Sequence, residues 1–230
     1  MIDYNKRLVS PSTDPVPKDG LIEYAEDVKF GGADLLHCDV MDGEFVPRKT
    51  INEYVVADLR KANILPLDVH LMIRKPHKKI RKYAKMKPEY ITIEYEAFEK
   101  ARHLIKCLKV MRRRKIHGGL AIAPRTSVAV LVPFLGLIDT VLVMGVEPGR
   151  SGQTMDPMTV HKVAELNMLR QRYKSNLFIE VDGGVTPENA EELYNAGANS
   201  VVSGKYVYTA ISRRAAIARI KGEDLDTVFK

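Results

Sequence analysis

Short apolar runs recur along the chain, and a longer segment with helical spacing follows each of them. Eight runs have the composition of buried strands, and they cover residues 7–10, 34–40, 66–73, 89–95, 119–123, 139–146, 176–182 and 199–203. Helices are predicted at residues 18–30, 53–61, 76–87, 98–114, 127–135, 157–174, 187–195 and 209–222. Strict alternation of this kind indicates parallel strands joined by helices.

Eight such units predict a closed (β/α)₈ TIM barrel. An open doubly wound sheet is the structural alternative, but it would leave strands at its edges, whereas most of these runs are apolar throughout. With 230 residues and 45% hydrophobic content, the chain can bury a full core, and no Gly/Ser/Pro-rich linker divides it. We therefore expect a single domain over residues 1–230. Residues 128–146 are apolar, but Pro133, Gly136 and Asp139 interrupt them, which favours a helix and a strand over a membrane span.

The net charge of +7 favours anionic partners in general. The densest basic run, residues 111–115, ends a predicted helix, where cations complement the helix dipole. No aromatic residues interleave with these charges, so a solvated basic face is favoured over an RNA site, and we expect neither nucleic acid nor membrane as a partner. Cys38 and Cys107 give no disulfide framework, and no basic-then-apolar leader precedes the first strand, so a cytoplasmic protein is expected.

Candidate metal ligands lie in three of the predicted strands. His37, Asp39 and Met41 alternate with apolar residues and so share one face of the second strand. His70 lies near the end of the third strand, and Asp182 ends the seventh. A single such residue is more often a satisfied polar group than a ligand. In a barrel, however, all four would meet at the carboxyl ends of the strands, where two imidazoles and two carboxylates suit a divalent cation.

Asp39 and Asp182 come from strands well apart around the ring, so they would approach a bound substrate from different sides. Such a pair suits removal of a carbon-bound proton on one face and its return on the other. A carboxylate with a pKa near its reference value of about 4 is a weak base towards carbon, and a metal polarising an adjacent carbonyl would close that gap. Met41, Met72 and Met144 could add a dry, polarizable wall to the site, although core packing is the simpler role for each.

A second group of residues suits phosphate binding, because glycines let backbone N–H groups approach an anion closely. These residues follow the sixth, seventh and eighth strands, and they are Gly149, Arg150, Ser151, Gly152, Gly183, Gly184, Gly204 and Lys205. Two further acids, Asp68 and Glu180, precede His70 and Asp182 by two residues, so we expect each to lie one layer below that neighbour and to support it.

Four motifs resemble the ribulose-phosphate 3-epimerase family in order and separation: LHCDVMDGEFVP, LDVHLMI, VLVMGVEPG-x-SGQ and IEVDGGVTPENA. The resemblance implies a TIM-barrel enzyme that interconverts D-ribulose 5-phosphate and D-xylulose 5-phosphate at C3. It implies one divalent ion, zinc or iron with manganese or cobalt as alternatives, held by the positions of His37, Asp39, His70 and Asp182. It also implies that the two aspartates form the acid/base pair, that Ser12 and His70 contact substrate, and that the protein is a homo-oligomer.

The departures from the family pattern surround the substrate. Glu94 stands where the family usually has histidine, Ala123 precedes Pro124 in place of asparagine, and Arg150 and Lys205 bring charge to the phosphate loops. A hexulose 6-phosphate such as allulose 6-phosphate is therefore an alternative substrate. A sugar-phosphate-binding protein with little turnover is a second alternative. The related orotidine-phosphate decarboxylase group is disfavoured, because its motif needs lysine where Met41 stands.

Overall fold

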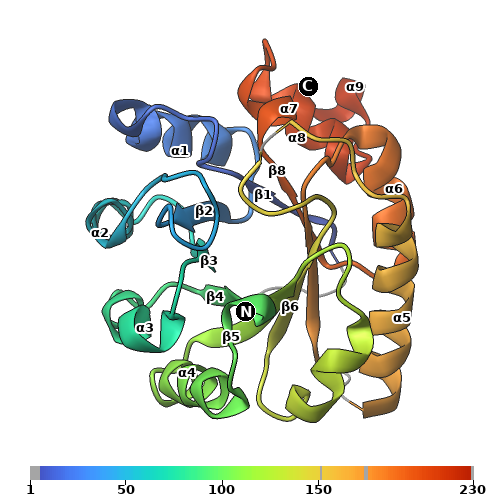
Figure 1. The fold of residues 1–230 in the computed structure, drawn as a ribbon. Coiled ribbons are helices and arrows are strands. Elements are labelled where there is room, and N and C mark those ends of the chain that lie inside the picture. The colour runs from blue at the N-terminus through green and yellow to red at the C-terminus, as the bar shows by residue number, and fades with distance from the viewer. Residues whose placement is uncertain (1–5, 151, 174–175, 229–230) are drawn as a thin grey trace.

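A computed structural model describes residues 6–150, 152–173 and 176–228. Eight parallel strands form one sheet that curls into a barrel (Figure 1). They are β1 (Leu8–Pro11), β2 (Leu36–Met41), β3 (Leu67–Met72), β4 (Tyr90–Glu94), β5 (His117–Ile122), β6 (Thr140–Met144), β7 (Phe178–Asp182) and β8 (Ser200–Ser203). Their order in the sheet is β1-β8-β7-β6-β5-β4-β3-β2. A parallel bridge between Ser12 and His37 connects β1 to β2, and the predicted (β/α)₈ barrel is confirmed.

Helices surround the barrel on its outside (Figure 1). The α-helices are α1 (Leu21–Phe30), α2 (Glu53–Ala62), α3 (Pro76–Lys85), α4 (Ala101–Arg113), α5 (Met158–Tyr173), α6 (Pro187–Ala196), α7 (Lys205–Tyr208), α8 (Arg213–Lys221) and α9 (Leu225–Val228). Short 3₁₀ helices are η1 (Lys18–Gly20), η2 (Tyr95–Ala97) and η3 (Val128–Phe134).

Two of the predicted helices differ most from the observed ones. The α-helix predicted at residues 127–135 is the 3₁₀ helix η3, which contains Pro133. Proline has no N–H to donate, so it disfavours a regular α-helical ladder there. The helix predicted to begin at residue 209 begins instead at Arg213, because Ser212 caps it by accepting a hydrogen bond from the backbone N–H of Ala215.

The two faces of each strand have different surroundings. On β2, Leu36, Cys38 and Val40 belong to the main core between barrel and helices, while His37 and Asp39 point into the barrel. At the amino-terminal end, the interior is filled by the cluster of Leu8, Leu35, Tyr90 and Phe178, in which the Tyr90 and Phe178 rings stack with centroids 4.8 Å apart. The inward-facing polar residues therefore lie above an apolar plug, towards the carboxyl ends of the strands.

Candidate metal centre and active site

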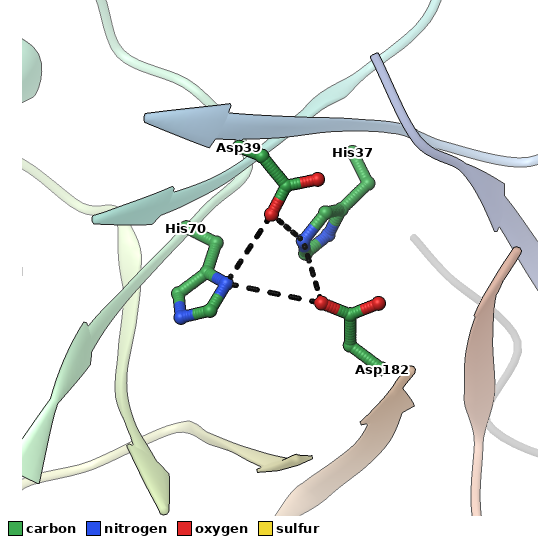
Figure 2. A group of neighbouring side chains, drawn as sticks. All are labelled: His37, Asp39, His70 and Asp182. Carbon is green, nitrogen blue, oxygen red and sulfur yellow. Dashed lines mark ion pairs between the residues drawn. The ribbon is translucent and has the colours of Figure 1, made fainter. Parts of the chain in front are cut away.

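Strand register brings the four candidate ligands together. β2 and β3 pair so that Asp39 lies opposite His70, and Asp182 reaches the same point from the end of β7. Figure 2 shows the four side chains converging inside the barrel. Asp39 Oδ1 lies 3.4 Å from His37 Nε2 and 3.5 Å from His70 Nδ1. Asp182 Oδ2 lies 3.8 Å and 4.0 Å from the same two nitrogens.

Each imidazole is held by a carboxylate behind it. Asp68 Oδ2 lies 2.5 Å from His37 Nδ1, and Glu94 Oε1 lies 2.9 Å from His70 Nε2. All four of these side chains are fully buried. A carboxylate that accepts one ring N–H leaves the other ring nitrogen with a free lone pair, which is the usual arrangement of a metal-binding histidine.

Asp68 contacts a different histidine from the one predicted. Sequence spacing suggested that Asp68 lies beneath His70, but the register of β2 and β3 places it directly opposite His37. Glu180, expected to support Asp182, instead accepts a hydrogen bond from Ser200 Oγ at 2.7 Å. The sequence left the role of Glu94 open, and its contact with His70 shows which side chain it supports.

The inward-facing nitrogens, His37 Nε2 and His70 Nδ1, are buried without a hydrogen-bond partner in the described part of the chain. These nitrogens and one oxygen from each aspartate lie within 4.8 Å of one another. Ligands at about 2.0–2.1 Å around a tetrahedral ion would be about 3.4 Å apart, close to the shortest edges of this group. Two nitrogens and two carboxylate oxygens fit a divalent transition metal such as zinc or iron.

The charge inside the barrel also favours a cation. Five buried or nearly buried carboxyl groups lie among the four candidate ligands or directly behind and beneath them, and they are Asp39, Asp68, Glu94, Glu180 and Asp182. Within the described residues, their ion pairs involve His37 and His70 and no lysine or arginine. Burial alone would lower the pKa of His70, but Asp39 and Glu94 outweigh it and raise that pKa to about 10. Without an ion, the histidines therefore carry the compensating charge as protons.

The two aspartates differ in their affinity for a proton. Burial would raise the pKa of Asp39, but His37 and His70 outweigh it and hold the pKa well below its usual range. Burial and the adjacent Asp39 charge raise the pKa of Asp182 to about 7, against the opposing effect of the histidines. Two neighbouring carboxyls with separated pKa values are typical of an acid/base pair.

A cleft of about 540 Å³ opens over the four ligands at the carboxyl ends of the strands. Ser12 lies in its wall and donates a hydrogen bond from Oγ to Asp39 Oδ2 at 2.6 Å. The expected substrate contacts in the cleft lining are Ser12, Met41, Met72, Met144, Gly149, Arg150, Gly152, Gly183, Gly184, Gly204 and Lys205. His70 lies beneath the lining because it is fully buried. Ser151 lies outside the described residues.

Gly183 needs its glycine conformation. Its φ is +106°, and a Cβ there would lie 2.4 Å from Cγ2 of Val146. A side chain would therefore push the end of β7, which carries Asp182, away from the loop after β6.

Two polar residues of the cleft were not predicted from the sequence. Thr186 and Asn189 line it from the start of α6, where they form a reciprocal capping box. The sequence signal was present, because Thr186 before Pro187 predicted a helix start. Lys205, predicted as a loop residue, is the first residue of the short helix α7.

This fold and this site define a class of protein: a TIM-barrel enzyme with a candidate divalent-metal site between two acidic side chains. The model of the ribulose-phosphate 3-epimerase family matches residues 9–208. The chain belongs to that family.

Among the relatives is the ribulose-phosphate 3-epimerase of Bacillus subtilis, which is 39% identical over 198 residues, covering 86% of this chain and 90% of the relative. The chloroplastic ribulose-5-phosphate-3-epimerase of Arabidopsis thaliana is 36% identical over 214 residues, covering 93% and 76%. The names of these relatives support the conclusion that this chain is an epimerase.

Solved structures with low sequence identity resemble this chain in fold alone. KGPDC from Streptococcus mutans superposes with a TM-score of 0.73 at 12% identity and covers 97% of this chain and 99% of that one. The 3-keto-L-gulonate-6-phosphate decarboxylase of Vibrio cholerae gives 0.70 at 14% identity, covering 94% and 98%. None of the described helices has the length and apolar character that crossing a membrane requires.

Proposed function

We propose that this chain inverts C3 of D-ribulose 5-phosphate to give D-xylulose 5-phosphate, using one divalent ion, zinc or iron, and two aspartates. The observation that carries the proposal is the pair of buried imidazole nitrogens that face Asp39 and Asp182 at the floor of the cleft and have no hydrogen-bond partner within the part of the chain that the structure describes. The names of the relatives support the substrate.

His37, Asp39, His70 and Asp182 would hold the ion. Asp68 and Glu94 fix the two rings so that Nε2 of His37 and Nδ1 of His70 present lone pairs to it. A divalent ion bound there supplies a Lewis acid that stabilises negative charge on the oxygens of a ketose.

Proton transfer is assigned to the aspartates. One aspartate, as a carboxylate, removes the C3 proton and becomes protonated, and the other, as a carboxylic acid, gives its proton to the opposite face of the resulting enediolate and becomes a carboxylate. Ser12 fixes Asp39 by donating to its Oδ2, so Asp39 is held in one orientation. The Asp182 side chain is 16% exposed, against 5% for Asp39, and so has the more open access to the cleft.

The rest of the cleft would bind the sugar phosphate. Met41, Met72 and Met144 line it next to the aspartates and exclude water from the reacting carbon. The phosphate would lie against backbone N–H groups near Gly183, Gly184 and Gly204, together with the loop residues Gly149 and Gly152. Arg150 and Lys205 add positive charge there.

A hexulose 6-phosphate is a weaker candidate. The substitutions that suggested it are Glu94 and Ala123, and neither lines the cleft. Glu94 faces His70 instead, so its presence bears on the metal and not on the length of the sugar. From the family resemblance we also propose a cytoplasmic homo-oligomer that acts in the pentose phosphate pathway; light scattering on the purified protein tests the oligomer.

Metal analysis followed by kinetics tests the proposal. We expect one zinc or iron per chain and a higher kcat/KM for D-ribulose 5-phosphate than for D-allulose 6-phosphate. A preference for the hexulose phosphate would overturn the substrate. Tight binding of either sugar phosphate without solvent exchange at C3 would show a binding protein and overturn the enzyme.

A further inference from the structure

Positive charge is concentrated on two helices of the barrel. Residues 74–88 and 100–115, which contain α3 and α4, hold 16 of the 36 Lys and Arg residues and no Asp or Glu. With those 16 set aside, 20 basic residues remain against 29 acidic ones in the rest of the chain. The net positive charge of the protein is therefore a property of this one region.

The fold joins the two basic segments into one surface, here named the α3–α4 basic face and defined as residues 74–88 and 100–115. The helices lie side by side on the outside of the barrel (Figure 1), and the rings of His77 and His103 stack across them with centroids 4.0 Å apart. All of the 16 cationic residues except the half-buried Lys79 are exposed. Within the described residues, only Lys79 and Lys82 have carboxylate partners, Asp42 and Glu53.

This arrangement works against helix stability. Lys78 and Lys82, and likewise Arg102 and Lys106, are like charges four residues apart on one helix face, which is a destabilising spacing. A surface that only needed to be soluble would mix both signs. The uncompensated charge is better explained by an anionic partner that neutralises it.

The chemistry of the face selects among anionic partners. Among the described residues, the large exposed apolar side chains are Ile22, Phe30, Tyr54, Val132, Met158, Met168, Tyr173 and Ile211, and none belongs to α3 or α4. Protein interfaces are anchored by aromatic and aliphatic side chains, membrane binding needs apolar insertion or a lipid beside the charges, and single-stranded nucleic acid stacks on aromatic rings. A duplex backbone needs none of these, because cations alone neutralise its phosphates.

We propose that the α3–α4 basic face binds the phosphate backbone of a nucleic-acid duplex without reading its sequence. The 13 residues of α4 span about 20 Å, a length of duplex axis that carries roughly ten phosphates. None of the residues that line the catalytic cleft lies in this face, so the two sites are separate. The sequence favoured a solvated face because no aromatic residues interleave with the charges, but binding to a duplex backbone does not require aromatic rings.

Fluorescence anisotropy with the full-length protein and two short labelled duplexes of unrelated sequence tests the proposal. We expect equal affinity for both, falling about 10³-fold between about 50 and 200 mM salt if six phosphates are contacted. A variant with Lys78, Arg81, Arg102 and Lys106 changed to Gln should reduce the slope of log K against log salt by as much as about 3.6. The matched control changes four exposed cations on other elements, Lys6, Lys18, Lys29 and Arg219, to Gln and should bind like the wild type.

Several outcomes would overturn the proposal. One is that the protein does not bind duplex at low salt, and another is that the control variant loses as much duplex affinity as the α3–α4 variant. A third is that polyglutamate competes with duplex for the protein as well as unlabelled duplex does at the same charge concentration. A fourth is that the protein binds phosphatidylserine vesicles in preference to duplex. Because neither variant changes a residue of the cleft, unchanged epimerase activity and circular dichroism would show that both remain folded.

Discussion

The contact between Glu94 and His70 gives the sharpest prediction about the metal centre. Both side chains are fully buried, and Glu94 Oε1 lies 2.9 Å from His70 Nε2. By accepting the Nε2 proton, Glu94 leaves Nδ1 able to present its lone pair to an ion held beside Asp39 and Asp182. We therefore expect substitutions at Glu94 to weaken metal binding without touching a ligand.

The size of the effect follows from what each substitution leaves behind. Loss of a carboxylate behind a metal-binding histidine typically costs 10–100-fold in metal affinity, or about 1.4–2.8 kcal/mol. Glu94→Gln removes the charge but keeps an oxygen that can accept from His70, so its loss should lie near the lower end. Glu94→Leu leaves the Nε2–H unpaired in a fully buried position, so its loss should lie near the upper end.

Competition with a chelator, followed by metal analysis, measures these affinities. Glu89→Gln is the matched control, because Glu89 also faces a histidine, His117 at 3.6 Å, but at the amino-terminal end of the barrel. Thermal unfolding of the metal-free proteins separates a folding defect from a binding defect. If both Glu94 variants bound metal as tightly as the wild type and the control, the role assigned to Glu94 would be wrong.

Three further predictions concern phosphate, protons and backbone. Lys205→Ser should raise KM and weaken its dependence on salt, whereas an unchanged KM would make Lys205 a mere surface residue. Metal binding to the metal-free protein should release protons, because the pKa of His70 is raised to about 10 and the ion must displace that proton. The affinity of the protein for the metal should therefore rise with pH. Calorimetry in two buffers of different ionisation enthalpy measures the proton release, and equal heats of binding in the two buffers would contradict it. Gly183→Ala should lower the free energy of unfolding by about 1–3 kcal/mol, since φ at this position is +106° and a valine side chain blocks the Cβ. Gly136→Ala, with nothing within 4 Å and no positive φ, is its control and should leave the melting temperature nearly unchanged.

Much of the fold was predictable because its signals are local. The alternation in β2 placed His37 and Asp39 on the inner face, since side chains of a strand alternate. The barrel then required strand ends to converge, which gathered His70 and Asp182 from distant segments. These inferences needed only the hydrophobic periodicity of the chain and the general rule that the carboxyl ends of all barrel strands lie on one face.

What the sequence did not reveal depends on register and packing. Asp68 was expected beneath His70 on its own strand, but the offset between β2 and β3 places it opposite His37. Glu94 reaches His70 because β3 and β4 are neighbours, a contact that no spacing along the chain encodes. The basic face has the same origin, because its two segments become one surface only when α3 and α4 pack together.

Hydrogen exchange at C3 tests the central claim most directly, that Asp39 and Asp182 act on opposite faces of one ketose beside one ion. In deuterated water, metal-loaded Asp39→Asn and Asp182→Asn should each lose about 10²–10⁴-fold in interconversion, with metal content measured alongside. Each variant should still exchange the C3 hydrogen of one epimer, and the two variants should do so with opposite epimers. Full interconversion by either variant, with its metal in place, would contradict the account.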